Sequence, residues 1–175
     1  MQTTTSRIAL VLGATGGVGG ATAQALVDKG WTVKALTRRA MPANGPIQWI
    51  KGDAMNAADV LGAAAGAQVI VHAVNPPGYR DWERQVLPMI DNTIAAARAV
   101  DARIVLPGTI YNYGPDAFPL LREESVQNAP TRKGEIRVEL ERRMEAAACD
   151  GVRSLILRCG DFFGPQAGNN WFAQG

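Results

Sequence analysis

The sequence of 175 residues predicts an α/β fold, a doubly wound parallel sheet with helices on both of its faces. Short apolar segments, which are typical of buried strands, alternate six times with helical segments. This alternation indicates β-α-β units with right-handed crossovers. The run at 67–74 is nearly continuous in apolar residues, as expected of a parallel strand that is covered on both faces. A glycine-rich turn also joins the first strand to the first helix.

That turn follows an apolar strand at 8–12 and contains Gly13, Gly16 and Gly19, after which apolar residues take helical spacing from Val18. Glycine suits a turn with positive φ and lets a phosphate or a strand approach the backbone closely. The helix N-terminus adds unpaired N–H groups and partial positive charge, which suit a pyrophosphate. We therefore predict a nucleotide site, although the spacing is G-x-x-G-x-x-G; the alternative is a tight turn without a ligand. The predicted contacts here are Gly13, Thr15, Gly16, Gly17, Val18 and Gly19.

A second strand is predicted at 31–37, and it ends in Arg38 and Arg39. This position, about 20 residues beyond the glycine turn, is where a dinucleotide-binding fold meets the adenosine ribose. An acidic residue there would bind the 2′-hydroxyl of NAD, but 36–40 contains none. Two guanidinium groups suit a 2′-phosphate instead, so the sequence favours NADP over NAD. The alternative is a pair of solvated loop arginines.

The middle of the chain continues the same alternation. A turn-rich link leads to a short strand at 47–51, an alanine-rich helix is expected at 59–67, and a fourth strand follows at 67–74. The carboxyl ends of parallel strands border the ligand crevice of such a sheet. We therefore expect the strand ends at Gly13 and Arg38 and those that follow to converge on one cleft. The further cofactor contacts predicted there are Asp53, Ala54, Ala73, Val74 and Asn75.

The second half of the chain supplies the last two units. A long helix is expected at 82–100, where Pro88 marks either a kink or a late start. The segments after it are a strand at 103–107, a loop at 108–114, an irregular stretch at 115–130, a helix at 131–150 and a strand at 152–158. No element is predicted for 166–175.

Composition limits the function classes. Hydrophobic residues make up 47% and charged residues 19% of the chain, with a net charge of +2, so a globular protein is expected and a nucleic-acid binder is disfavoured. The polar N-terminus and the lack of a long apolar run predict a soluble, cytoplasmic protein without a membrane segment. Cys149 and Cys159 lack metal-ligand spacing and are predicted to be a buried, reduced pair. His72 is predicted to be a satisfied core histidine, and no metal site is expected.

These motifs together resemble the extended short-chain dehydrogenase/reductase superfamily, in its NAD-dependent epimerase/dehydratase group, over nearly the whole chain. The matching segments are the G-x-x-G-x-x-G turn at 13–19, an S-x-x-x-Y-G-like loop at 109–114 and an R-x-x-x-x-x-G-P segment at 158–165. The resemblance implies a Rossmann-like NAD(P)-binding domain at 1–165, and the start of a truncated substrate-binding region at 166–175. It also implies that Thr109 is the catalytic hydroxyl and that the helices at 82–100 and 131–150 form a homodimer.

One departure from the family pattern concerns its Y-x-x-x-K pair, in which the Tyr exchanges a proton with substrate and the Lys binds the nicotinamide ribose. Lys133 and Arg137 stand at these two positions. Arg137 still suits ribose hydroxyls, whereas Lys133 would act as a base only with a strongly lowered pKa, which Arg137 favours and Glu141 opposes. The alternatives are a phenol from Tyr111 or Tyr113, or a solvated helix face with i,i+4 pairs such as Arg137–Glu141 and Glu139–Arg143.

The predicted function is that of an NAD(P)-dependent oxidoreductase or an epimerase/dehydratase-like enzyme. Its substrate is expected to be a small hydroxyl or carbonyl compound, with nucleotide sugars among the candidates, and NADP is preferred over NAD. The catalytic candidates are Thr109, Lys133 and Arg137. The alternative is a non-catalytic NAD(P)-binding redox sensor or regulatory protein that retains the cofactor cleft.

Overall fold

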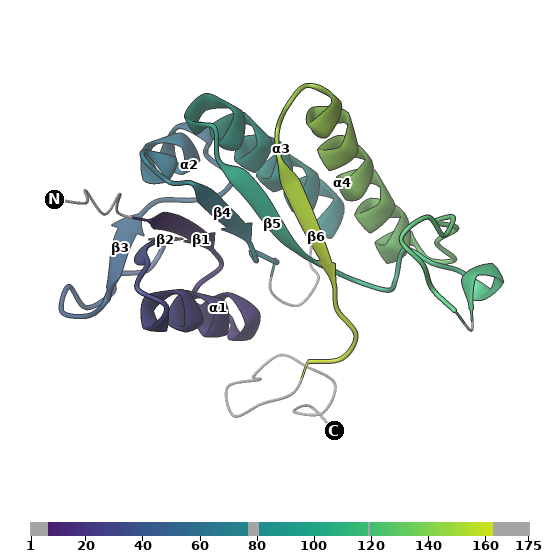
Figure 1. Cartoon of the computed structure of the whole chain (residues 1–175), viewed down its shortest axis with the longest axis horizontal. Coiled ribbons are helices and arrows are strands. Elements are labelled where there is room, and N and C mark those ends of the chain that lie inside the picture. The colour runs from purple at the N-terminus through teal and green to yellow at the C-terminus, as the bar shows by residue number, and fades with distance from the viewer. Residues whose placement is uncertain (1–6, 77–80, 119, 163–175) are drawn as a thin grey trace, which may run out of the picture.

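The structure, a computed structural model, describes residues 7–76, 81–118 and 120–162 (Figure 1). Six strands form one sheet in the order β3-β2-β1-β4-β5-β6, and every neighbouring pair is parallel. The strands are β1 (Ile8–Leu12), β2 (Thr32–Thr37), β3 (Ile47–Lys51), β4 (Val69–His72), β5 (Arg103–Gly108) and β6 (Ser154–Arg158). The helices are α1 (Gly17–Asp28), α2 (Ala57–Ala64), α3 (Trp82–Val100), α4 (Arg132–Cys149) and the short 3₁₀ helix η2 (Pro115–Ala117). The predicted Rossmann-like fold is confirmed.

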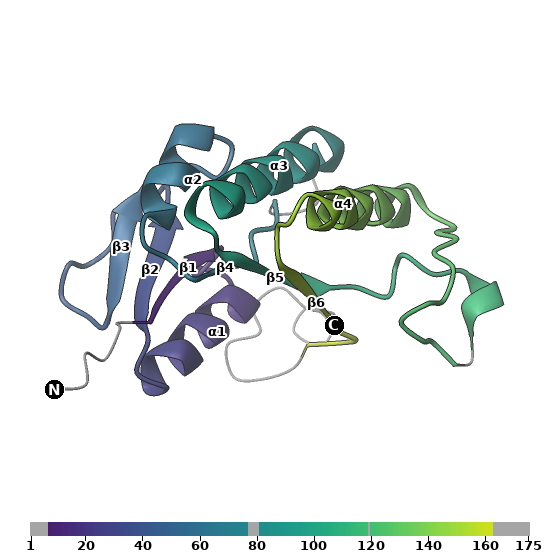
Figure 2. The same ribbon diagram turned by 45° about the horizontal axis from the view of Figure 1, so that its top comes forward.

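The helices cover both faces of the sheet. Helices α2, α3 and α4 lie along one face, and α1 lies on the other (Figures 1 and 2). The strand order reverses between β1 and β4, because the chain builds outward from β1 to β3 and then crosses back to β4. A parallel sheet binds its ligands at such a switch point, at the carboxyl ends of the strands.

The apolar run of β1 divides between the two layers of the core. Leu10 and Leu12 belong to the large cluster shared with α2, α3 and α4, and Val11 belongs to the smaller cluster shared with α1. Successive side chains of a strand point to opposite faces, so a strand that is buried on both faces must be apolar throughout.

Two predicted helices differ from the structure, α2 in its bounds and α3 in its course at Pro88. Helix α2 begins at Ala57 rather than at 59, because the side chain of Asn56 accepts hydrogen bonds from Ala58 N and Asp59 N and so caps the first turn. Helix α3 is continuous from Trp82 to Val100 with Pro88 inside it, so the late start is wrong. Its apolar face packs into the core, and this packing outweighs the single hydrogen bond that proline removes.

The outer strand β6 has one sparsely covered face. Ile156 packs against the large core cluster, whereas Leu155 and Leu157 point the other way and are 47% and 51% exposed. They pair with Val105 and Pro107 of β5, and Val105 packs against the cluster on the α1 side. The α1 layer therefore stops short of β6. The predicted region 166–175 lies outside the described residues.

No helix in the described part of the chain has both the length and the apolar character needed to cross a membrane.

Candidate functional site

The glycine turn brings β1, α1 and the end of β4 into backbone contact. Gly13 has a φ of +89°, and a Cβ there would lie 2.5 Å from the carbonyl oxygen of Ala73. A Cβ on Gly19 would lie 2.2 Å from the carbonyl oxygen of Gly13. Real Cβ atoms do not approach backbone this closely, so both positions require glycine for the turn to close.

Helix α1 begins at this turn, and none of its own side chains offsets the partial positive charge of its N-terminus. Its N-cap is Gly16, no side chain caps the first turn, and no acidic residue lies in that turn. Thr15, Gly16 and Gly17 are exposed, and Val18 is half-buried. The partial positive charge of a 12-residue helix is therefore accessible at the carboxyl edge of the sheet, as a phosphate group requires.

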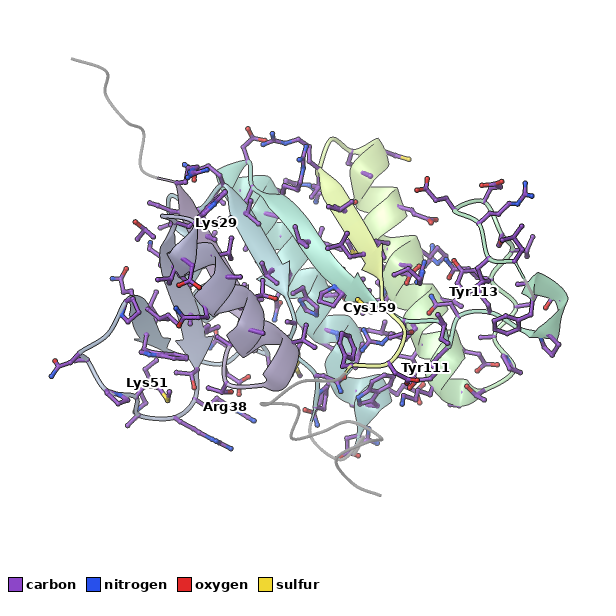
Figure 3. All side chains as sticks on the ribbon, turned by 60° about the horizontal axis from the view of Figure 1, so that its bottom comes forward. Lys29, Arg38, Lys51, Tyr111, Tyr113 and Cys159 are labelled. Carbon is purple, nitrogen blue, oxygen red and sulfur yellow. The ribbon has the colours of Figure 1, made fainter. Side chains whose placement is uncertain are left out.

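The adjacent strand ends lie at the same edge. Arg38 follows β2 with a side chain that is 68% exposed, and its Nη1 lies 4.0 Å from Asp53 Oδ2 beyond β3. Figure 3 shows Arg38 and Tyr111 at this end of the sheet and Lys29 at the opposite end. The backbone N–H of Arg39 donates to Thr37 Oγ1 at 3.2 Å. The predicted convergence of strand ends is thus present in the structure.

Three of the predicted cofactor residues also have structural partners. Ala54 is buried, and its carbonyl oxygen accepts a hydrogen bond from Asn92 Nδ2 of α3 at 2.9 Å. Ala73 and Val74 form the backbone against which Gly13 packs, and both are half-buried. Ala73 and Val74 therefore lie against the glycine turn, and Ala54 is tied to α3.

A cation–aromatic stack occupies the other half of the edge. Lys133 Nζ lies 4.3 Å from the ring centre of Tyr111 and 5.4 Å from that of Trp82, and Arg137 Cζ lies 4.9 Å from Trp82. Arg137 also donates a long hydrogen bond, 3.5 Å, to Asn75 Oδ1 at the end of β4. Burial lowers the pKa of Lys133, the charge of Arg137 lowers it further, and Tyr111 acts in the opposite direction.

The predicted ion pair between Arg137 and Glu141 is wrong. Glu141 is 2% exposed and binds Arg158 and Gln127, while Arg137 packs on Trp82. Helix α4 turns Glu141 inward toward the end of β6, which the sequence spacing alone does not reveal. Glu141 therefore does not oppose the lowering of the Lys133 pKa. The other predicted pair, Glu139–Arg143, is confirmed at 2.8 Å.

Thr109 lies in the loop that leaves β5 and is half-buried. Its hydroxyl donates to Asn112 Oδ1 at 3.1 Å, and its carbonyl accepts from Arg158 Nη1 at 2.9 Å. The N-terminus of α4 closes on this loop, since a Cβ on Gly134 would lie 2.2 Å from the carbonyl oxygen of Tyr111. Sequence reasoning missed Asn112 altogether, because a buried amide in a loop leaves no spacing pattern.

His72 is a satisfied core histidine, as predicted. It is 3% exposed, and its Nδ1 lies 2.8 Å from Thr93 Oγ1 on α3. Burial, with a smaller effect of Arg137, lowers the pKa of His72 to about 3.

Cys149 and Cys159 are both free thiols, but the prediction that they are buried is wrong. Cys149 is exposed at the last residue of α4, and Cys159 is half-buried just beyond the outer strand β6. Within the described ranges, no group of three or more His, Cys, Asp or Glu side chains is placed to hold a metal ion.

The family model for the NAD-dependent epimerase/dehydratase family matches residues 9–172. The chain belongs to this family. A curated relative is the 3-diazoavenalumate denitrifying reductase of a Streptomyces species, 29% identical over 174 residues. That alignment covers 91% of this chain and 57% of the reductase, so the chain spans little more than half the length of the curated relative it matches.

Solved structures with a fold similar to that of this chain include two epimerases. The UDP-N-acetylglucosamine 4-epimerase of Bacillus cereus superposes with a TM-score of 0.82 at 20% identity, covering 95% of this chain and 57% of the epimerase. The UDP-glucose 4-epimerase of Brucella ovis in complex with NAD gives a TM-score of 0.75 at 20% identity, covering 87% and 51%. At this identity the likeness establishes the fold.

Proposed function

We propose that this chain binds NADP(H), or less tightly NAD(H), in the cleft at the carboxyl edge of its sheet. The observation that carries the proposal is the glycine turn, where a Cβ on Gly13 or Gly19 would collide with backbone and α1 presents an uncapped N-terminus. The turn and this N-terminus would hold the pyrophosphate through Thr15, Gly16, Gly17 and Val18. Ala54, Ala73, Val74 and Asn75 would line the remainder of the cleft.

Arg38 and Arg39 carry the proposed preference for NADP. Both follow β2 at the position of the adenosine ribose, and the Arg38 guanidinium is largely exposed, with Asp53 at 4.0 Å. A 2′-phosphate would draw a guanidinium into a charge-assisted contact, which a ribose hydroxyl does much more weakly.

The test is a calorimetric titration of the protein with NADPH and with NADH. We expect tighter binding of NADPH, and the double variant Arg38→Ala/Arg39→Ala is expected to lose roughly tenfold or more in NADPH affinity with little change for NADH. Lys29→Ala, which removes the same kind of charge at the opposite end of the sheet, is the matched control. Preferential binding of NADH would refute the proposed contact of Arg38 and Arg39 with a 2′-phosphate. Binding of neither cofactor would refute the proposed site.

We further propose that the chain takes part in oxidoreductase or epimerase/dehydratase-type chemistry on a small hydroxyl or carbonyl compound. The bound nicotinamide supplies or accepts hydride. Thr109 would hold the substrate oxygen, Lys133 would exchange a proton with it, and Arg137 would bind ribose hydroxyls beside Asn75. The lowered pKa of Lys133 supports its assignment, because a general acid or base works best with a pKa near the operating pH.

The named activities of the relatives define the substrate panel. UDP-N-acetylglucosamine and UDP-glucose represent the two epimerases, and 3-diazoavenalumate represents the reductase. Turnover that Lys133→Ala abolishes would support the enzyme. Cofactor binding without turnover of any member of the panel would support the alternative, a redox sensor or regulator, which the replacement of the family's Tyr and Lys by Lys133 and Arg137 favours.

The proposal also covers cellular location and oligomeric state. A cytoplasmic location suits the free thiols Cys149 and Cys159 and a pool of NADP(H). A homodimer through α3 and α4 is a prediction from the family resemblance, and light scattering on the purified protein tests it.

A further inference from the structure

A closed ring of hydrogen bonds joins the loop after β5 to α4 and β6. Thr109 Oγ1 donates to Asn112 Oδ1 at 3.1 Å, Asn112 Nδ2 donates to Gln127 Oε1 at 2.8 Å, and Gln127 Nε2 donates to Glu141 Oε2 at 2.8 Å. Arg158 donates to both oxygens of Glu141 and, from Nη1, to the carbonyl oxygen of Thr109 at 2.9 Å. The ring therefore begins and ends at the residue proposed to hold the substrate oxygen.

The negative charge of Glu141 determines the direction of the three side-chain bonds that link it to Thr109. A carboxylate has only acceptor atoms, so Gln127 must turn its amide nitrogen toward Glu141. Its remaining oxygen then requires a donor, which Asn112 supplies through Nδ2. The free oxygen of Asn112 in turn takes the single proton of the Thr109 hydroxyl. Reversing either amide would place two acceptors or two donors face to face.

Burial prevents solvent from relaxing this constraint. Asn112 is 0% exposed and Glu141 is 2% exposed, so their polar atoms must find partners within the protein. Arg158, with a side chain 28% exposed, lies 5.1 Å from the ring centre of buried Tyr113. Thr109, by contrast, is only half-buried.

We propose that Glu141 is a positioning residue that fixes the Thr109 hydroxyl as a hydrogen-bond acceptor toward the substrate. The inference rests on the proposed function, in which Thr109 holds the substrate oxygen. Its consequence is a division of labour between two groups. Thr109 accepts from a substrate hydroxyl, whereas the carbonyl form of the substrate takes its hydrogen bond from the Lys133 ammonium, which has only donors.

The hydroxyl proton of Thr109 is the direct readout. Its exchange with solvent is followed by the deuterium isotope shift on Thr109 Cβ in carbon-13 spectra of the full chain, with and without saturating NADPH. We expect Glu141→Gln to accelerate this exchange about tenfold or more, because the substituted amide no longer imposes one direction on the ring. Glu139→Gln is the matched control, since Glu139 lies on the same helix and binds two arginines outside the ring.

A second variant keeps the Glu141–Arg158 ion pair intact. Gln127→Leu removes the middle link and is expected to accelerate exchange at Thr109 in the same way, so it decides the matter even if Glu141→Gln does not fold. Unchanged exchange at Thr109 in the folded variants, or equal acceleration in Glu139→Gln, would overturn the role of Glu141.

The same spectra separate this inference from the proposed function. NADPH-induced shifts at Gly13–Gly19 report cofactor binding independently of the ring. Shifts without any dependence of Thr109 on Glu141 would overturn only the positioning role. Glu141-dependent exchange without such shifts would overturn the cofactor site, and with it the role of Thr109 toward a substrate.

Discussion

Two glycines in helices should respond to the same substitution with opposite signs. Gly62 lies in α2, where an added Cβ would have no neighbour within 4 Å, so Gly62→Ala gains the usual helix propensity of about 0.5–1 kcal/mol. Gly134 lies in α4, where a Cβ would stand 2.2 Å from the carbonyl oxygen of Tyr111 and 2.7 Å from Ala129 Cβ. The first of these atoms is backbone, so the helix and the loop must separate.

At Gly134 the free-energy cost of separating the helix from the loop exceeds the gain in helix propensity from alanine. Forcing one extra carbon into a packed contact costs about 1–3 kcal/mol, and the backbone partner at Gly134 places this site at the upper end. After the propensity gain, Gly134→Ala should destabilise the protein by about 2 kcal/mol. For a chain of this size the change lowers Tm by about 4–8 °C, whereas Gly62→Ala raises Tm by about 1–4 °C.

Thermal unfolding followed by circular dichroism at matched concentrations measures both shifts. The comparison controls for backbone entropy in the unfolded state, because both variants replace helical glycine with alanine. An increase in Tm for Gly134→Ala similar to that for Gly62→Ala would refute the close packing of α4 on the Tyr111 loop.

Cofactor binding, pH and thiol reactivity each provide a further prediction. Gly19→Ala should weaken NADPH binding by about tenfold or more in a calorimetric titration, because its Cβ would lie 2.2 Å from the Gly13 carbonyl oxygen. Unchanged affinity would contradict the proposed phosphate site at the glycine turn. Because burial lowers the pKa of His72 to about 3, the stability from its neutral ring is complete above pH 6.5. It is lost by about 1.4 kcal/mol per pH unit as pH falls toward 3. His72→Gln should flatten that slope in urea unfolding, and a folded-state NMR titration of this single histidine near pH 6.5 would contradict it. Exposed Cys149 should be alkylated several-fold faster at pH 8 than Cys159, whose pKa is raised by burial, and equal rates by peptide mass spectrometry would count against this.

The fold could be predicted from the sequence because local patterns determine it. The apolar run of β1, the glycines after it and the alternation of elements each follow from hydrogen bonding and burial within a short segment. The bounds of α2 depended on a single cap at Asn56, and the continuity of α3 through Pro88 depended on tertiary packing. The periodicity of apolar residues in the sequence predicts neither of these effects.

The candidate site was only partly predictable. Strand-end residues such as Gly13 and Arg38 converge because parallel strands share a carboxyl edge, which topology alone dictates. The partner of Glu141 could not be predicted, because Arg158 lies 17 positions further along the chain and meets it only through the packing of α4. Spacing of i,i+4 suggested Arg137 instead, which packs on Trp82.

The half-covered strand β6 has a consequence for handling the isolated chain. Leu155 and Leu157 project from a strand whose far edge pairs with no other strand in the described residues. An edge strand of this kind, with exposed leucines beside it, can pair with a strand of a second molecule and so promote aggregation. We expect concentration-dependent precipitation to start at this edge, and Leu155→Lys to raise solubility without changing the glycine turn.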